Sequence, residues 1–416
     1  MEVELPNLLW YGNNPRMIEL PDNWDVEVLD APGFHKPAVA PPAIADALAN
    51  PIGCPTLREL AEGAERVAIV FDDMTRPTPV SDIVPFVLAP LKEAGVPDDD
   101  ISFIPALGMH GALTNMEYRK KLGDAIVRKY PIYNHNPYDN CDYVGDTGTG
   151  LPVWLNREYL ACDLRIGIGS ITPHVHAGFG GGGKLILPGI SGIETITGFH
   201  RDVQMRDPAS TGLGRYDGNE MSAEIKRVTK MAGMAMKIDV LLNSHGGITD
   251  VFAGDPLEEY EAGVAVAKEH YATRSVTGCD IVIVNAYGKY NEMGICMIMA
   301  LNCVNFDRGT IVLIVDAPEG QVCHYLFRSF GKGHGGRLYF PRTTMPTGTV
   351  PEGLECIVMS AYHDRTMCDL FAPIGDVQLT DDWDQTLALL EKRFGERARV
   401  AVVPDGTMQY YTDPWT

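Results

Sequence analysis

The chain has 416 residues, of which 45% are hydrophobic and 21% are charged, and its formal net charge is −21 at pH 7. Nucleic acids and anionic membranes are bound by clustered Lys and Arg, so this charge argues against both as partners. A chain of this length exceeds what one hydrophobic core usually supports, which predicts two domains.

The nine cysteines include no C-x-x-C pair and no regular spacing. This pattern predicts reduced thiols rather than a disulfide framework or a zinc site. The N-terminus lacks a basic segment followed by an apolar run, and no stretch of about 18 apolar residues occurs. We therefore expect a soluble, cytoplasmic protein.

The predicted elements alternate between strands and helices. Residues 1–30 contain short strands separated by turn signals. Runs rich in Val and Ile follow, as expected for strands buried on both faces of a parallel sheet. These runs are 66–71, 101–104, 163–169, 280–284, 310–315 and 399–403, and helical patterns such as 83–94 and 222–234 lie between them. The alternation predicts an α/β architecture with mostly parallel sheets.

A helical, rather polar segment at 261–275 precedes the fresh strand run at 280. We therefore expect a domain boundary near residue 270, with an N-terminal domain of residues 1–270 and a C-terminal α/β domain of residues 271–416. The C-terminal segment 410–415 is aromatic enough to pack back on the first domain.

Polar residues follow the first three long strand runs. The first run leads into residues 72–79, which include Asp73, Thr75 and Arg76; the second leads to His110, and the third leads to His174. Ligands of α/β sheets bind beyond the carboxyl ends of the strands, so these residues are candidates for one site. The alternatives are a proline-stiffened turn with an aspartate cap for the first loop and a surface histidine for His110.

The most informative segment is 173–189, in which four consecutive glycines precede Lys184 and two histidines, His174 and His176, come before them. Residues 178–184 spell G-x-x-x-x-G-K, the start of a phosphate-binding loop. Leu185 stands where Mg²⁺ coordination needs Ser or Thr, and Pro188 follows too soon for a phosphate-cradling helix. A nucleotide hydrolase is therefore disfavoured, whereas phosphate contact by the glycines stays open.

The pair His174 and His176 is also similar to the metal pair of amidohydrolase barrels, in which a lysine bridges the metals. That lysine comes from a distant strand, whereas Lys184 lies eight residues after His176. A metal-dependent hydrolase that uses His174 and His176 therefore remains an alternative.

Several motifs together resemble the nickel-pincer nucleotide-dependent lactate racemase family over at least residues 70–200. They are Asp73-x-Thr75-Arg76-Pro77-x-Pro79, Gly108-Met109-His110, Pro173-His174-x-x-Ala177-Gly178, the glycine run with Lys184-x-Ile186-Leu187-Pro188-Gly189, and the later His200. The resemblance implies a racemase or epimerase that inverts the α-carbon of a 2-hydroxy acid by reversible hydride transfer. It also implies two domains with the cofactor and the active site at their interface.

The resemblance further implies roles for individual residues. A nickel-pincer nucleotide would be attached to Lys184, with His200 as a nickel ligand, and would be supplied by cofactor-synthesis proteins. His110 and His174 would be the two acid/bases, because a planar keto acid needs one on each face. Arg76 would bind substrate carboxylate or cofactor phosphate. The cofactor would also contact Asp73, Thr75, Gly181, Gly182 and Gly183.

The chain departs from the family beyond residue 287. Where the family carries Tyr-Gln-x-x-Lys, this sequence reads Gly294-Ile295-x-x-Ile298, although Lys289 could approach from the preceding loop. The difference predicts a homologue with altered substrate specificity. His176 matches no family residue, and could orient His174, extend the substrate pocket or be structural. A non-enzymatic nickel or cofactor carrier is a further alternative.

Overall fold

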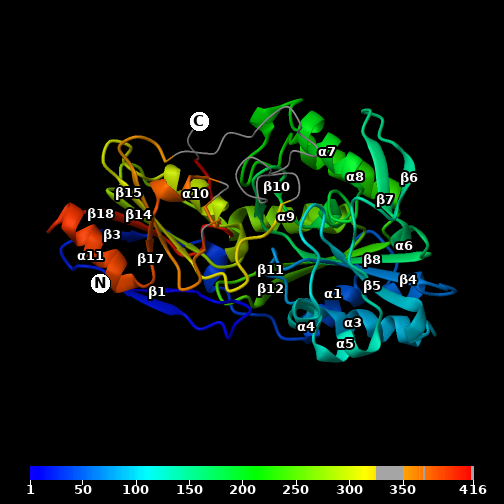
Figure 1. Ribbon diagram of the computed structural model, residues 1–416. Helices are drawn as coiled ribbons and strands as arrows, with labels where there is room; N and C mark the ends of the chain where they lie inside the picture. The colour runs from blue at the N-terminus through cyan, green and yellow to red at the C-terminus, as the bar shows by residue number, and fades with distance from the viewer. Residues whose placement is uncertain (325–349, 365, 369–370, 414–416) are drawn as a thin grey trace. The chain divides into compact units, whose positions relative to one another are not determined.

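The computed structural model describes residues 1–324, 350–364, 366–368 and 371–413, and it divides into two units. One unit is formed by residues 35–270. The other combines residues 1–34 with residues from 271 onward. Figure 1 shows both units and labels many of their elements.

The 35–270 unit is built on a five-stranded sheet in the order β12-β11-β8-β4-β5. All neighbouring strands are parallel except β11 and β12, which are antiparallel. The strands are β4 (Val67–Asp72), β5 (Ile101–Ala106), β8 (Leu164–Ser170), β11 (Met236–Leu242) and β12 (Ile248–Gly254). The two-stranded pairs are β6 (Cys141–Asp146) with β7 (Pro152–Asn156), and β9 (Pro173–His174) with β10 (Gly178–Phe179).

Helices cover both faces of this sheet, which is why its central strands are apolar and almost wholly buried. Figure 1 shows α1 and α3 on one face, and α8 and α9 on the other. The helices are α1 (Pro42–Ala49), α2 (Leu57–Leu60), α3 (Val80–Glu93), α4 (Asn115–Leu122), α5 (Asp124–Lys129), α6 (Arg157–Leu160), α7 (Ile193–Gly198), α8 (Glu220–Ala232) and α9 (Glu258–His270).

The second unit contains a six-stranded, wholly parallel sheet in the order β17-β16-β15-β14-β18-β3. Its strands are β3 (Asp25–Val28), β14 (Ile281–Ala286), β15 (Thr310–Val315), β16 (Glu355–Met359), β17 (Gln378–Thr380) and β18 (Arg399–Val403). Its helices are α10 (Gly294–Leu301) and α11 (Trp383–Phe394), and its smaller pairs are β1 (Glu2–Leu5) with β2 (Arg16–Glu19) and β13 (Ala272–Thr273) with β19 (Tyr410–Tyr411).

The α/β architecture with mostly parallel sheets is confirmed, and each of the six Val- and Ile-rich runs forms a strand. The division differs from the expected domains in residues 1–34, which belong with the C-terminal half. Hydrogen bonding explains this, because β3 adds a parallel edge strand next to β18. The chain's later segment 410–411 pairs with β13 inside the same unit rather than with residues 35–270; Pro414 and Trp415 lie outside the described residues.

The nine cysteines form no disulfide bonds in the structure. Among the described residues, no helix is both long and apolar enough to cross a membrane.

Candidate functional site

Three loops meet at one edge of the five-stranded sheet. They follow β4, β5 and β8, which are neighbours in the order β8-β4-β5 and run parallel, so their carboxyl ends lie together. Asp73 comes directly after β4, His110 comes four residues after β5, and His174 ends the short strand that follows β8. The sheet order thus brings the sequence-predicted loops to one place.

Asp73 and His110 form a close pair in this edge. Oδ2 of Asp73 lies 2.6 Å from Nδ1 of His110. A carboxylate accepts the Nδ1 proton, so the neutral imidazole carries its lone pair on Nε2. This arrangement orients the ring and prepares Nε2 to accept a proton.

The Asp73 carboxyl is held in its ionised form. Burial favours the neutral acid, but the charge that His110 carries when it is protonated and its hydrogen bond outweigh it, and the charge of Arg76 and the hydroxyl of Thr75 add to them. The pKa of Asp73 is therefore far below its ordinary value. Oδ1 of Asp73 accepts the backbone N–H of Thr75 at 2.9 Å, and Nη1 of Arg76 donates to Oγ1 of Thr75 at 2.9 Å. These bonds join the three loop residues to His110.

His174 contacts the lysine of the glycine loop. Nε2 of His174 lies 3.0 Å from Nζ of Lys184. The backbone N–H groups of His176 and Ala177 point at Nδ1 of the same ring, at 3.1 and 3.3 Å. Nδ1 is then an acceptor, and the hydrogen bonds assign the proton of the neutral ring to Nε2. Nε2 consequently carries a lone pair in His110 and an N–H in His174.

His176 and His200 extend the cluster. The ring centroids of His174 and His176 are 5.7 Å apart, and those of His176 and His200 are also 5.7 Å apart. His200 lies in a π-helical turn, Phe199–Val203, a local geometry that often marks functional sites. Its Nδ1 is 2.9 Å from the carbonyl oxygen of Ile196 and donates to it, so Nε2 carries the lone pair that a metal ligand needs.

The glycines of the loop are required by close packing. A Cβ on Gly182 would lie 2.5 Å from the ring of Tyr260, and one on Gly183 would lie 1.8 Å from Oγ1 of Thr229. Gly181 has a φ of +87°, which L side chains rarely adopt. Packing thus accounts for Gly181, Gly182 and Gly183 without a ligand, and their contact with a cofactor stays a prediction.

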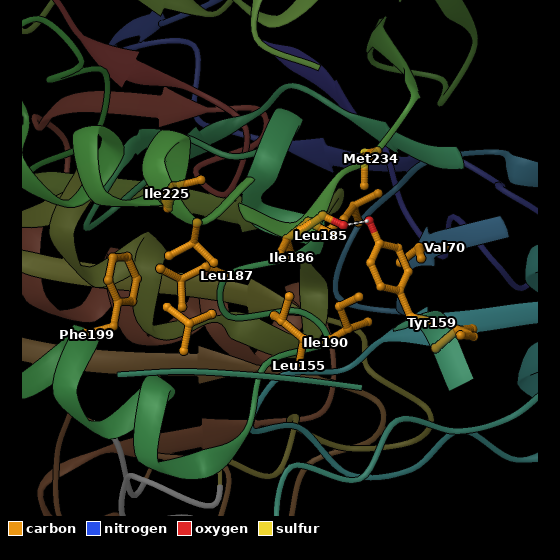
Figure 2. Packing of buried hydrophobic residues seen from close by; sticks show 14 of the residues in the cluster. Val70, Leu155, Tyr159, Leu185, Ile186, Leu187, Ile190, Phe199, Ile225 and Met234 are labelled. Carbon is orange, nitrogen blue, oxygen red and sulfur yellow. Dashed lines mark hydrogen bonds between the residues drawn. The ribbon is translucent and has the colours of Figure 1, made fainter. Parts of the chain in front are cut away.

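Apolar anchors fix both Lys184 and His200. Figure 2 shows Leu185, Leu187 and Phe199 in one buried cluster of the 35–270 unit. Leu185 follows Lys184 directly, and Phe199 precedes His200. Because interiors are close-packed, residues next to such anchors have little freedom to move.

Comparison with known proteins shows which proteins this chain resembles. Residues 11–212 match the model of the lactate racemase N-terminal domain. The lactate racemase of Lactiplantibacillus plantarum is 27% identical over 91% of this chain and 92% of the relative, and that of Thermoanaerobacterium thermosaccharolyticum is 27% identical over 97% of each. The chain is a homologue of the lactate racemase family. This homology supports a racemase activity in general.

The fold of this homologue is similar to solved structures. The lactate racemase apoprotein from T. thermosaccharolyticum superposes with a TM-score of 0.73 at 22% identity, covering 99% of this chain and all of that chain. A protein from Thermotoga maritima superposes with a TM-score of 0.64 at 17% identity, covering 91% of this chain and all of that one. At these identities the superpositions support the fold alone.

The residues predicted to depart from the family motif lie in the other unit. Gly294, Ile295 and Ile298 begin α10, where Ile298 is 44% exposed. Lys289 is buried, and its backbone N–H donates to Oγ1 of Thr407 at 2.9 Å.

Sequence reasoning missed four buried charges behind the site. Nζ of Lys121 lies 2.8 Å from Oδ1 of Asp72 and donates to the carbonyl oxygen of Arg76 at 2.7 Å. Lys237 and Asp239 form a second buried pair on β11. A signal for the second pair exists, because opposite charges two residues apart in the apolar run 236–242 must share one face of a buried strand.

Proposed function

We propose that this homologue is a 2-hydroxy acid racemase or epimerase that works with a nickel-pincer nucleotide attached to Lys184. The observation that carries the proposal is the contact of Lys184 with His174, at 3.0 Å, on the sheet edge that also holds the Asp73–His110 pair. One edge therefore combines a point of attachment with two titratable imidazoles. This combination supports an exchange of protons at a bound substrate.

The residues present fit the implied cofactor. An N–H on Nε2 of His174 can donate to Lys184 only when the lysine amine is uncharged, and an uncharged amine can form an amide-type bond. Nε2 of His200 offers an imidazole lone pair, which suits nickel. When bound, the cofactor would accept a hydride from the substrate α-carbon and return it to either face. Arg76 would bind substrate carboxylate or cofactor phosphate, and Asp73 and Thr75 would contact the cofactor through other groups.

His110 would take the hydroxyl proton of one enantiomer. Its Nε2 carries the lone pair, and the ionised Asp73 stabilises the imidazolium that forms. His174 presents an N–H at Nε2 and would supply a proton on the other side. In the reverse direction the roles exchange. The complementary protonation of the two rings is what a reaction with one acid and one base requires.

The substrate would be a 2-hydroxy acid with a larger side chain than lactate. The family lysine is replaced by Ile298, and the family tyrosine by Gly294, which removes an ammonium group and a large side chain. Apolar surface favours substrates with additional methylene groups.

Intact-mass measurement tests the proposal. Protein produced together with the cofactor-synthesis proteins is expected to carry a mass excess that peptide mapping locates on Lys184. An unmodified mass, together with no inversion of any 2-hydroxy acid, would reject the proposal. The matched control is Lys184→Ala, which we expect to fold normally without the adduct.

Two other functions have less support. A hydrolase would need His174 and His176 to share a metal with further ligands, and neither belongs to a group of three or more converging donors among the described residues. A non-enzymatic cofactor carrier would give the Asp73–His110 pair no role. If His110→Ala changes neither the activity nor the cofactor content of the loaded protein, the carrier function is favoured.

A further inference from the structure

A buried ion pair lies beneath the glycine loop. Lys237 and Asp239 occupy one face of β11, both are completely buried, and Nζ of Lys237 lies 2.5 Å from Oδ1 of Asp239. Nζ also donates to the carbonyl oxygen of Ile238 at 2.8 Å. Desolvation makes such a pair a poor source of stability, because apolar residues of similar size often serve as well. Its presence therefore calls for another role.

The neighbouring strand β8 carries glycines, and therefore no side chains, next to the pair. Gly167 and Gly169 stand opposite Lys237 and Asp239 in the parallel register. A Cβ on Gly167 would lie 2.7 Å from Cδ of Lys237, and a Cβ on Gly169 would lie 3.3 Å from Oδ1 of Asp239. The sheet thus accommodates the pair through two glycines in its centre, although glycine inside a strand is unfavourable.

Asp239 reaches from the sheet to the loop. Its Oδ2 accepts the backbone N–H of Gly182 at 2.6 Å. On the other side of Gly182, the ring of Tyr260 leaves no room for a Cβ. The backbone is therefore held from two directions at a point two residues before Lys184. A hydrogen bond to an ionised acceptor is stronger than one between neutral groups.

A second acidic residue, Glu259, interacts with the pair. It is completely buried, and burial and the negative charge of Asp239 raise its pKa well above the ordinary value. A raised pKa favours the neutral form of Glu259 beside the Lys237–Asp239 pair. Asp239 remains the acceptor for Gly182.

We propose that Asp239, neutralised by Lys237, is a positioning residue that fixes the glycine loop at Gly182 and thereby sets where Lys184 meets His174. This inference rests on the proposed function only for the identity of the group attached to Lys184. The anchoring itself is a property of the protein without cofactor.

Two double variants isolate the anchoring bond. K237M/D239N removes both charges but keeps an oxygen acceptor for Gly182, whereas K237M/D239L removes the acceptor as well. Hydrogen exchange of a peptide covering residues 178–188, measured without cofactor, is expected to be about tenfold faster in the Leu variant than in the Asn variant. Peptides of β4 and β5 should exchange equally in both. Equal exchange of the loop peptide in the two variants would overturn the proposal.

Attachment at Lys184 provides the second readout. After production with the cofactor-synthesis proteins, K237M/D239N should retain the Lys184 adduct, while K237M/D239L should lose most of it at a similar melting temperature. Equal adduct levels would contradict the positioning role. If wild-type protein carries no adduct, the proposed function fails, and the exchange comparison still decides the anchoring.

A wild-type measurement covers the case in which the Leu variant does not fold. Residue-resolved exchange should show the Gly182 amide protected about as strongly as the amides of β11. Exposed Gly148 is the unprotected reference. Exchange of Gly182 as fast as that of Gly148 would reject the anchor.

Discussion

Nδ1 of His110 lies 2.6 Å from Oδ2 of Asp73, and this carboxylate is kept ionised by its neighbours. The pair fixes both the orientation and the tautomer of the imidazole. Asp73→Asn removes the negative charge that stabilises protonated His110. We expect kcat of the loaded enzyme to fall by about 10²- to 10⁴-fold, with the adduct on Lys184 retained.

A double-mutant cycle separates this role from a structural one. If Asp73 acts on the proton transfer through His110, H110A/D73N should be about as slow as His110→Ala alone. If kcat of the double variant instead falls by the product of the two single-variant factors, Asp73 acts independently of His110.

The contact between His174 and Lys184 predicts an unusually reactive amine. Without cofactor at pH 7, Lys184 should be acylated by a small activated ester faster than exposed Lys230, because an uncharged amine is the nucleophile. His174→Ala should slow acylation of Lys184 and leave Lys230 unchanged, as peptide mass spectrometry would show. A Lys184 rate that His174→Ala does not alter would contradict the assigned proton on Nε2.

His200→Ala should lower nickel content in loaded protein while the organic part stays on Lys184. The reason is that His200 supplies an imidazole lone pair, whereas attachment depends on the lysine amine. Metal analysis combined with intact mass separates the two quantities. Exposed His245 gives the control variant His245→Ala; full nickel occupancy in His200→Ala would refute the ligand role.

Buried His135 should make stability fall in acid. Its Nε2 donates to the carbonyl oxygen of Ser191, its Nδ1 accepts from Asn156, and burial lowers its pKa to about 4. Below its unfolded pKa of about 6.5 the unfolded chain binds a proton that the folded chain does not, so stability present above that pH declines down to about pH 4. The contribution is about 3 kcal/mol. Denaturant unfolding at several pH values gives the free energy of unfolding as a function of pH. Between about pH 6.5 and 4 this free energy should fall less steeply in His135→Gln than in the wild type. An equal fall in both would exclude His135 as a cause of the loss of stability in acid.

The proposed replacement of the family motif in α10 predicts a substrate preference. Each additional methylene buried on apolar surface contributes about 0.8 kcal/mol, so kcat/KM should rise several-fold per methylene from lactate to larger 2-hydroxy acids. Chiral chromatography of C3 to C6, aromatic and aldonic acids measures this. Ile298→Lys should shift preference back toward lactate. A wild-type preference for lactate over every larger acid would show that Gly294–Ile298 does not replace the family motif.

The sequence predicted the strands because buried parallel strands are runs of Val and Ile, as in β4 and β15. It also indicated which loops meet, since polar residues follow three neighbouring strands. It did not indicate that residues 1–34 join the C-terminal half, because β3 is a short edge strand whose partner, β18, lies about 370 residues later in the chain.

The charges behind the site were also missed, for a physical reason. Lys121 on α4 reads as part of a solvated basic face, and only the fold brings it against Asp72. For the glycine run, the sequence and the structure give different explanations. Its sequence indicates ligand contact, whereas Tyr260 and Thr229 show that packing alone already requires glycine there.

Inversion of an α-deuterated 2-hydroxy acid in water tests the central claim most directly. The loaded enzyme should convert either enantiomer into the other with deuterium retained at the α-carbon, because a transferred hydride does not exchange with solvent while His110 and His174 exchange only the hydroxyl proton. Chiral chromatography with mass detection reads both quantities at once. Absence of inversion, or inversion with extensive loss of deuterium to water, would contradict the account.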